Sequence, residues 1–350
     1  MQFCVEPRDP FWEGFFLPSP CECRRVCPRY KRSETKDPLQ GGFHFGEDIG
    51  EEFSVKFDEI MERIEKEVRL YIERTGEKNQ LRDACEYALT NGGKRLRPLL
   101  VWLIADALGH RVDVMPAALS VEFFHTASLI ADDLPCMDND DERRGRPSLH
   151  LAFDEGVALL TSYTLIAAGY EGIYRNGLVL KSHPILAEKS DAIAVLCLEA
   201  VTRCAGLKGA PLGQFLDIRP PEFTLQMAEK IIYLKTVTLF EITFLFGWLF
   251  GGGDIKMIED VKGCAYHLGL AFQIADDLAD LKQDALRQNE INVAKIMGQK
   301  KAFGLFEKHL SCFSSQLKKL GLQTAGFDSI VEWIGRYAKE GAIQSLLIHA

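Results

Sequence analysis

From Phe53 onward, apolar residues recur with the period of an amphipathic α-helix, and this pattern constrains the fold more than any other feature of the chain. In the first such segment Phe57, Ile60, Ile64 and Val68 share one face, and charged residues cover the other. No convincing alternation typical of a β-strand is found in the sequence. Similar helical patterns recur at residues 80–91, 96–108, 115–134, 153–174, 189–205, 225–250, 256–282 and 300–338, the last of which is predicted to be two helices. The sequence therefore predicts an all-α bundle of about ten helices with long central members.

Glycine residues separate these segments and predict helix ends and turns. The stretch Gly206–Gly213 is predicted to be such a turn. The most apolar run, Leu239–Phe250, is too short to span a bilayer and contains Glu241, so it is predicted to be a buried core helix. No stable membrane insertion is expected.

Length and composition indicate one large domain with an extension. A chain of 350 residues with 47% hydrophobic content can bury a sizeable core, which we assign to residues 51–350. Residues 1–50 are rich in Pro, Gly, Cys and charge, and they are predicted to be a disordered extension. Within this extension Cys21, Cys23 and Cys27 fit no zinc-binding spacing well.

Charge and cysteine usage argue against several classes of function. The net charge of −9 argues against nucleic-acid binding, so an anionic substrate would need local cations. Ten cysteines scattered without regular pairing fit a reducing interior better than a disulfide framework. No segment has the pattern of a signal peptide, and acidic residues near the start argue against an organellar transit peptide. A cytoplasmic location is therefore expected.

Two aspartate clusters, within Asp132–Asp138 and Asp276–Asp280, each follow a largely apolar segment. Carboxylates at the end of an apolar helix are costly to bury unless they are paired or hold a cation. Either cluster alone could be a solvated acidic turn. Together they predict a shared divalent-metal site.

The spacing within the clusters predicts how each could reach a metal ion. Asp276 and Asp280 lie one helical turn apart, so both can approach the same ion from one face. Asp132 and Asp138 would lie on different faces of an ideal helix. Pro135 is therefore expected to end the helix and to let the chain fold Asp138 back.

Basic motifs accompany the aspartates. The segment Gly93–Pro98 begins a helix, and Lys94 and Arg97 lie three residues apart within it, so both can face one anion. The other motifs are His125 ahead of the first cluster, the pair Arg143-Arg144 after it, and the pair Lys235-Thr236. Each motif alone has an ordinary structural explanation, and it is their combination and order that are specific.

In content and order these motifs resemble those of the trans-isoprenyl diphosphate synthases. The resemblance covers residues 53–350. It rests on the stretches Gly93–Pro98, His125, Asp132–Asp138 with Arg143–Gly145, Gly213–Asp217, Lys235-Thr236 and Phe272–Asp280. It implies an isoprenoid-synthase-type bundle around a central cavity and a prenyltransferase that uses several magnesium ions, and a homodimer is expected.

The resemblance also implies roles for individual residues. Magnesium would be bound by Asp132, Asp138 and Asp276, with Asp133 and Asp280 in support, and the main catalytic side chains would be Asp132, Asp138, Asp276 and Lys235. Isopentenyl diphosphate would be held by Lys94, Arg97, His125 and Arg144. The allylic diphosphate would be held by Arg143, Lys235, Thr236 and Gln273.

The implied reaction is ionisation of the allylic diphosphate, attack of the isopentenyl double bond on the allylic cation, and loss of a proton. Magnesium and Lys or Arg donors would stabilise the departing diphosphate. No dedicated carboxylate base is evident, so the released diphosphate is expected to take the proton.

Two departures from the family pattern bear on activity. Ser162-Tyr163 stands where the family usually has Gly-Asp, which is expected to remove a polar residue near the site. The loop Lys282–Gly298 is shorter than usual and places Glu290 at a lysine position. Arg287 or Lys295 could substitute for that lysine.

The product is expected to be geranylgeranyl diphosphate. Ala127 is small at a position where farnesyl-length enzymes usually carry an aromatic residue, and Phe124 would form the floor of the pocket one turn deeper, or else simply pack in the core. Three alternatives remain: a farnesyl diphosphate synthase, a non-catalytic subunit of a heteromeric synthase, and a class I terpene cyclase. Turnover by the isolated protein would exclude the subunit, and a cyclase would release a hydrocarbon.

Overall fold

The computed structural model describes residues 51–281 and 291–346. These residues all lie in the unit Lys36–Ala350, and the other unit, Met1–Thr35, falls wholly outside them. The predicted disordered extension and the loop with Arg287 and Glu290 also lie outside the described residues.

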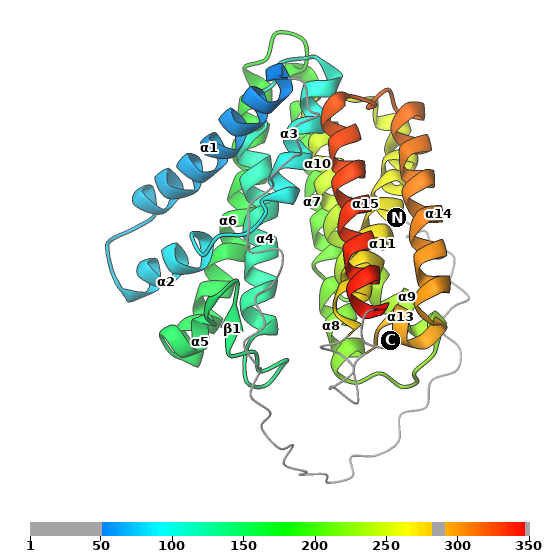
Figure 1. Cartoon of the computed structure of the whole chain (residues 1–350). Helices are drawn as coiled ribbons and strands as arrows, with labels where there is room; N and C mark the ends of the chain where they lie inside the picture. Colours follow the sequence, from blue (N-terminus) through cyan, green and yellow to red (C-terminus); the bar gives the residue numbers. More distant parts are fainter. Residues whose placement is uncertain (1–50, 282–290, 347–350) are drawn as a thin grey trace, which may run out of the picture. The chain divides into compact units, whose positions relative to one another are not determined.

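The described residues are almost entirely helical, which confirms the predicted all-α class (Figure 1). The amino-terminal half comprises α1 (Glu51–Arg74), α2 (Gln80–Leu89), α3 (Leu96–Leu108), α4 (Met115–Asp132), α5 (Leu149–Ala152), α6 (Glu155–Lys181) and α7 (Ser190–Cys204). The carboxyl-terminal half comprises α8 (Ala210–Ile218), α9 (Leu225–Ile232), the π-helical turn η3 (Tyr233–Val237), α10 (Thr238–Phe250), α11 (Ile258–Ala279), α13 (Val293–Met297), α14 (Gln299–Lys319) and α15 (Ala325–Leu346). Two short strands, β1 (Glu142–Arg143) and β2 (Arg146–Pro147), pair antiparallel in a hairpin between α4 and α5.

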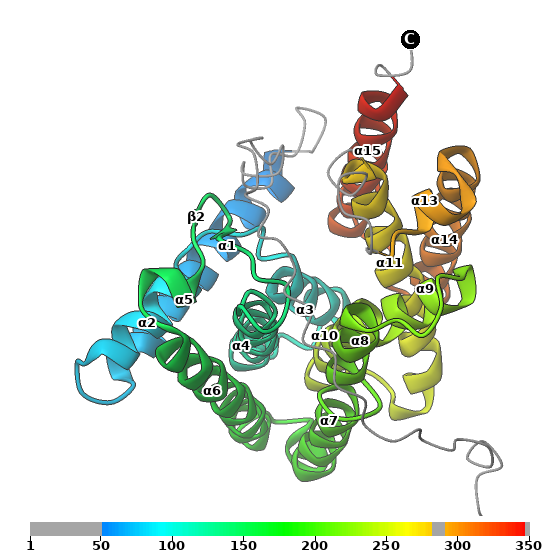
Figure 2. The same ribbon diagram turned by 90° about the horizontal axis from the view of Figure 1, so that it is seen from below.

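Helix α10 forms the centre of the core, as its unbroken apolar sequence predicts. All 13 of its residues are buried, and it packs against α3, α4, α7 and α11. In the end-on view of Figure 2, α4 and α6 lie side by side, while α11, α14 and α15 lie on the other side of α10. The one charged residue of α10, Glu241, is paired with Arg203 of α7 at 2.7 Å, so its burial is compensated.

The predicted helix at residues 225–250 is confirmed, with one turn of π-helix in its middle. Leu225–Phe250 is long and apolar enough to cross a membrane, but 83% of its apolar window is buried within the protein. It is therefore a core helix of this bundle. The π-helical turn η3 carries Lys235 and Thr236, and single π-turns within helices are frequent at functional sites.

The prediction of a turn over Gly206–Gly213 is wrong in its second half, because α8 begins at Ala210. Gly213 lies inside that helix, and a Cβ atom there would come within 2.5 Å of the backbone nitrogen of Lys235. The glycine is thus required by close packing of α8 on η3 and not by a turn.

Glycine also sets the spacing of α4 and α6. A Cβ at Gly169 would lie 2.5 Å from the ring of Phe124, and one at Gly172 would lie 2.7 Å from the Cβ of Ser120. The Ser120 hydroxyl donates a hydrogen bond to the Gly169 carbonyl at 2.6 Å. The two helices therefore pack closely along the segment that ends at the first aspartate cluster.

Candidate functional site

The first aspartate cluster is a turn at the end of α4. The helix ends at Asp132, and the backbone N–H of Asp138 donates to the carbonyl of Asp132 at 2.9 Å. This confirms that the chain folds back after Pro135. Both carboxylates consequently face the same neighbour, Lys235 of η3.

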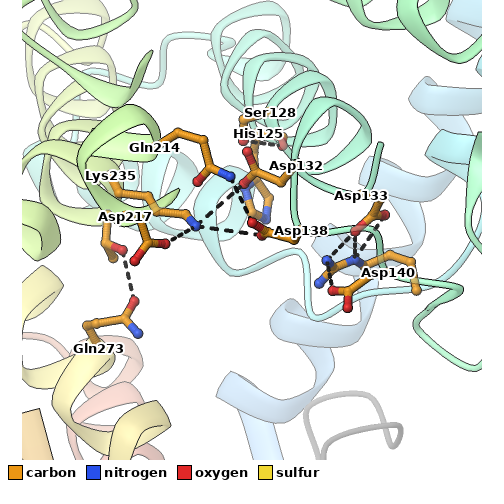
Figure 3. Close-up of polar contacts among 12 residues, drawn as sticks. His125, Ser128, Asp132, Asp133, Asp138, Asp140, Gln214, Asp217, Lys235 and Gln273 are labelled. Carbon is orange, nitrogen blue, oxygen red and sulfur yellow. Dashed lines mark hydrogen bonds and ion pairs between the residues drawn. The ribbon is translucent and has the colours of Figure 1, made fainter. Parts of the chain in front are cut away.

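Lys235 lies among three carboxylates (Figure 3). Its Nζ is 2.7 Å from an oxygen of Asp217, 3.9 Å from one of Asp138 and 4.0 Å from one of Asp132. The amide nitrogen of Gln214 donates to Asp138 at 3.1 Å. The sequence identified Gln214 and Asp217 as parts of a motif but gave them no role, and only the packing of α8 on η3 places them here.

Burial dominates the electrostatics of these carboxylates. It raises the pKa of Asp132 to about 7 and also raises the pKa of Asp138, even though Lys235 lowers both. Burial alone would lower the pKa of Lys235, but Asp217, Asp132 and Asp138 raise it above its ordinary value. Lys235 therefore stays protonated. Its positive charge does not fully offset the effect of burial on the carboxylate of Asp132.

Asp133 does not join Asp132 and Asp138. Its carboxylate accepts hydrogen bonds from the guanidinium of Arg143, with Nε 3.0 Å from Oδ1, and Arg143 also pairs with Asp140 at 3.2 Å. Figure 3 shows Asp133 turned toward Asp140 and away from Lys235. The structure therefore places Asp133 and Arg143 in an ion-pair cluster beside the turn.

Three of the predicted anion-binding residues come together between α3, α4 and the hairpin. Nη1 of Arg97 lies 3.2 Å from Nε2 of His125, and Arg144 donates to the carbonyl of Gly92 at 2.6 Å. Burial is the main reason why the pKa of His125 lies well below its ordinary value, and the positive charges of Arg97 and Arg144 lower it further. The ring is therefore neutral. Burial lowers the pKa of Arg97 to about 10 despite Glu122 and Asp276 nearby, and it remains a cation at neutral pH.

Two buried polar atoms in this group have no hydrogen-bond partner within the part of the chain that the structure describes. They are Nε of Arg97 and Nδ1 of His125. Buried polar atoms are normally hydrogen-bonded, so these two atoms are candidates to bond a ligand. One belongs to a cationic side chain, Arg97, and the other to a neutral one, His125. An oxyanion such as a phosphate would satisfy the guanidinium.

Lys94, from the same motif as Arg97, contacts three aromatic rings. Its ammonium lies over the rings of Phe272, Trp333 and Tyr337, contributed by α11 and α15. The expectation that Lys94 and Arg97 face one anion is not tested by these contacts.

The second cluster lies at the end of α11. The N–H of Asp280 donates to the carbonyl of Asp276 at 2.9 Å, so the two residues occupy successive turns as predicted. Asp277 is buried, and its carboxylate accepts from the backbone of Val293 at 2.8 Å and from Gln273 at 3.0 Å. Asp277 thus anchors the start of α13.

The two clusters are linked through Gln273 and Arg97. The hydroxyl of Thr236 donates to the amide oxygen of Gln273 at 2.8 Å, which joins η3 to α11. The carboxylate of Asp276 raises the pKa of Arg97 by its charge, so the second cluster lies near the group formed by Arg97, His125 and Arg144.

The carboxylates of the two clusters suit magnesium in type. Across residues 51–281 and 291–346, no three Asp, Glu, His or Cys side chains converge as a ready-made cage. Magnesium is commonly bound by one or two carboxylates together with substrate phosphates, so it needs no such cage. The oxygen donors at the site and the raised pKa of Asp132 fit an ion that binds together with a phosphorylated ligand.

The two residues that depart from the family pattern, Ser162 and Tyr163, lie on different sides of α6. The side chain of Tyr163 is 58% exposed, whereas that of the preceding Ser162 is buried and donates to the carbonyl of Ala127 at 2.9 Å. Successive residues of a helix point in different directions, so Ser162 faces α4 and Tyr163 faces solvent. The expectation that this departure removes a polar residue near the site stays a prediction.

Comparison with known proteins identifies relatives by both sequence and structure. Residues 78–319 match the family model described as polyprenyl synthetase. The heterodimeric geranylgeranyl pyrophosphate synthase large subunit 2 of Arabidopsis thaliana is 36% identical over 237 residues, which make up 65% of this chain and 60% of that protein. The chain thus spans less than two thirds of this relative.

A bacterial relative and a solved structure match more of their own length. A farnesyl diphosphate synthase of Geobacillus stearothermophilus is 35% identical over 234 residues, which make up 64% of this chain and 74% of that protein. The crystal structure of an FPP/GFPP synthase from Zymomonas mobilis matches with a TM-score of 0.68 at 30% identity, and the match covers 80% of this chain and 99% of that one.

Proposed function

The chain belongs to the polyprenyl synthetase family, as its motifs predicted, and from this premise we propose that it condenses isopentenyl diphosphate with allylic diphosphates. The observation that carries the proposal is the position of Lys235 among Asp132, Asp138 and Asp217, with Gln273 linked to the same turn. A diphosphate and its counter-ions need such a combination of carboxylates and cations.

The allylic substrate would bind between the two aspartate clusters. Magnesium held by Asp132, Asp138 and Asp276 would neutralise the diphosphate and stabilise it as it departs. Lys235 would donate to the leaving diphosphate, and Asp217 would hold its ammonium in place. Asp280, Thr236 and Gln273 remain proposed supports of this substrate.

Arg143 would contact the same diphosphate from the hairpin. Its pairing with Asp133 and Asp140 fixes the guanidinium before the substrate arrives, so little side-chain freedom is lost on binding. We therefore include Asp133 among the supports of the site through Arg143, alongside its predicted support of magnesium.

Isopentenyl diphosphate would bind to Arg97, His125 and Arg144, with Lys94 at the edge of the site. Because His125 is neutral, it would contact a phosphate as a hydrogen-bonding group while the arginines supply the charge. The proton lost after condensation would pass to the released diphosphate.

We propose geranylgeranyl diphosphate as the product. Ala127 is buried in α4, and its small side chain would leave room for a longer product below the first aspartate cluster. Phe124 packs on Gly169 and meets the ring of Tyr170 edge-on at 5.3 Å, so these residues would limit the depth of the pocket.

We propose a homodimer formed through α6 and α7. Exposed apolar side chains follow one face of α6 and continue on the adjacent α7, among them Leu159, Tyr163, Ile166, Tyr174 and Val195. An apolar surface of this kind is complementary to itself, as a two-fold interface requires. Light scattering should give twice the chain mass, and Tyr163→Glu should lower it toward that of one chain. A single-chain mass for the unsubstituted protein would contradict the homodimer.

A cytoplasmic location is also proposed. The six cysteines in the described residues are free thiols, four of them buried, which suits a reducing compartment. Fractionation of cells that express the full chain would test it.

The metal site is tested by removing one charge from each cluster. Asp132→Asn or Asp276→Asn should each lower kcat by about 100-fold or more while leaving the helical signal unchanged, because the lost interaction is strongest in the transition state. The matched control is Asp141→Asn, which removes a neighbouring exposed carboxylate. Near-normal turnover in both cluster variants would refute the assignment.

A further inference from the structure

Three aromatic rings surround the ammonium of Lys94. Its Nζ lies 5.1 Å from the ring centroids of Trp333 and Tyr337 and 5.7 Å from that of Phe272. The rings of Trp333 and Tyr337 are stacked, with 7° between their planes. These distances are within the range of about 6 Å over which a ring face attracts a cation.

The second cation of the same motif lies on a connected ring. The guanidinium carbon of Arg97 is 4.8 Å from the centroid of Phe240, and Phe240 lies 5.6 Å from Phe272. Phe272 is in turn 6.5 Å from Trp333. We call the four rings of Phe240, Phe272, Trp333 and Tyr337 the aromatic platform.

Ring faces hold a cation differently from carboxylates. Arg95 of the same motif is buried between Glu65 and Glu122, each at 2.6 Å, so its charge is neutralised within the protein. An aromatic ring attracts a cation through its quadrupole and carries no net charge. A ring contact therefore does not itself cancel the attraction of a cation for an anionic ligand.

The platform also brings a distant part of the chain to the motif. Phe240 belongs to α10, Phe272 to α11, and Trp333 and Tyr337 to α15. No feature of the segment Gly93–Pro98 indicates this contact, because α15 reaches it only through the fold.

We propose that the aromatic platform positions Lys94 and Arg97 for the diphosphate of the second substrate, which makes Trp333 and Tyr337 of α15 positioning residues of that site. The inference rests on the proposed function and extends it to α15. Loss of a ring should allow the Lys94 ammonium more conformations, so that fewer molecules present it correctly to the anion.

The first test compares Trp333→Leu with Trp333→Phe. Trp333→Leu should raise the KM for isopentenyl diphosphate by about 3- to 30-fold, the range expected for one cation–ring contact, with kcat and the KM for the allylic substrate within about twofold. Trp333→Phe keeps a ring and should recover most of the loss. In a Lys94→Met background Trp333→Leu should add little, because the cation is already absent.

A second test does not depend on turnover. In the protein without substrates, the rate at which an amine-acylating reagent modifies Lys94 is followed by peptide mass spectrometry. Trp333→Leu should raise this rate several-fold relative to Trp333→Phe, while the exposed Lys66 reacts unchanged. Tyr337→Leu serves the same purpose if Trp333→Leu fails to fold.

The outcomes separate this inference from the proposed function. If the protein shows no prenyl transfer, the proposed function fails, and the platform is judged by Lys94 labelling and by the Kd of inorganic diphosphate from calorimetry. Unchanged labelling in the leucine variants would overturn the platform. Faster labelling with an unchanged KM, or with an unchanged Kd for inorganic diphosphate, would overturn its role in binding the second substrate.

Discussion

Replacing Gly93 with alanine is expected to displace Arg144 and to weaken the binding of isopentenyl diphosphate. A Cβ atom at Gly93 would lie 2.5 Å from Cζ and 2.6 Å from Nη1 of Arg144. Ordinary contact begins near 3.4 Å, so the guanidinium must move by about 1 Å. Such a shift would disrupt the hydrogen bond from Arg144 to the Gly92 carbonyl, now 2.6 Å long.

The size of the effect follows from the contact that would be lost. A hydrogen bond to a charged group contributes about 1.5–3 kcal/mol, which corresponds to roughly a 10- to 150-fold change in an equilibrium constant. Because the guanidinium is moved and not removed, we expect kcat/KM for isopentenyl diphosphate to fall by about 10-fold or somewhat more. The KM for the allylic substrate should remain within about twofold.

Gly92→Ala is a matched control. Gly92 has a φ of +75° and Gly93 a φ of +110°, so alanine is strained at both positions, but a Cβ at Gly92 would meet nothing within 4 Å. Steady-state kinetics with each substrate varied in turn should therefore show the isopentenyl defect in Gly93→Ala alone. Equal defects in the two variants would refute the displacement of Arg144 and point to backbone strain.

Three further predictions concern the core, the response to acid and the product. Arg95→Met should lower the free energy of unfolding, measured in urea, by about 3–5 kcal/mol, because it removes the guanidinium paired with the buried carboxylate of Glu122. Adding Glu122→Gln should restore part of the lost stability. A loss below about 1 kcal/mol in Arg95→Met would contradict the prediction. Burial is the main reason why the pKa of His309 is lowered to about 4, and His267 adds to it, so this residue makes the folded state less stable as the pH falls from about 6.5 toward 4. His309→Gln should remove about 1 kcal/mol of that loss, after a discount for partial exposure. An unchanged dependence of the free energy of unfolding on pH in this range would refute the prediction. Ala127→Tyr should shift the main product to fifteen carbons, and an active variant with an unchanged product distribution would show that the pocket does not follow this face of α4.

The sequence was sufficient to predict the features that depend on local patterns. Helical periodicity predicted the all-α bundle, and the spacing of Asp132 and Asp138 around Pro135 predicted the turn that brings them together. The period and the turn follow from the geometry of the chain over a few residues, so they do not require knowledge of distant contacts.

Features that depend on distant packing could not be predicted in this way. Asp132 and Asp133 are adjacent, yet one faces Lys235 and the other faces Arg143 of the hairpin. Glycine at position 213 suggested a turn because the sequence does not show that another backbone lies against it. The rings around Lys94 come from α11 and α15, and no local pattern connects these helices to the segment Gly93–Pro98.

The most direct test of the proposed activity is product formation by the purified full chain with magnesium. The protein is incubated with isopentenyl diphosphate and, separately, with each allylic primer of five, ten and fifteen carbons, and the products are separated by chain length. We expect each primer to be extended to a diphosphate of twenty carbons, with no turnover when magnesium is chelated. Release of a hydrocarbon, or no extension of any primer, would contradict the proposed prenyltransferase.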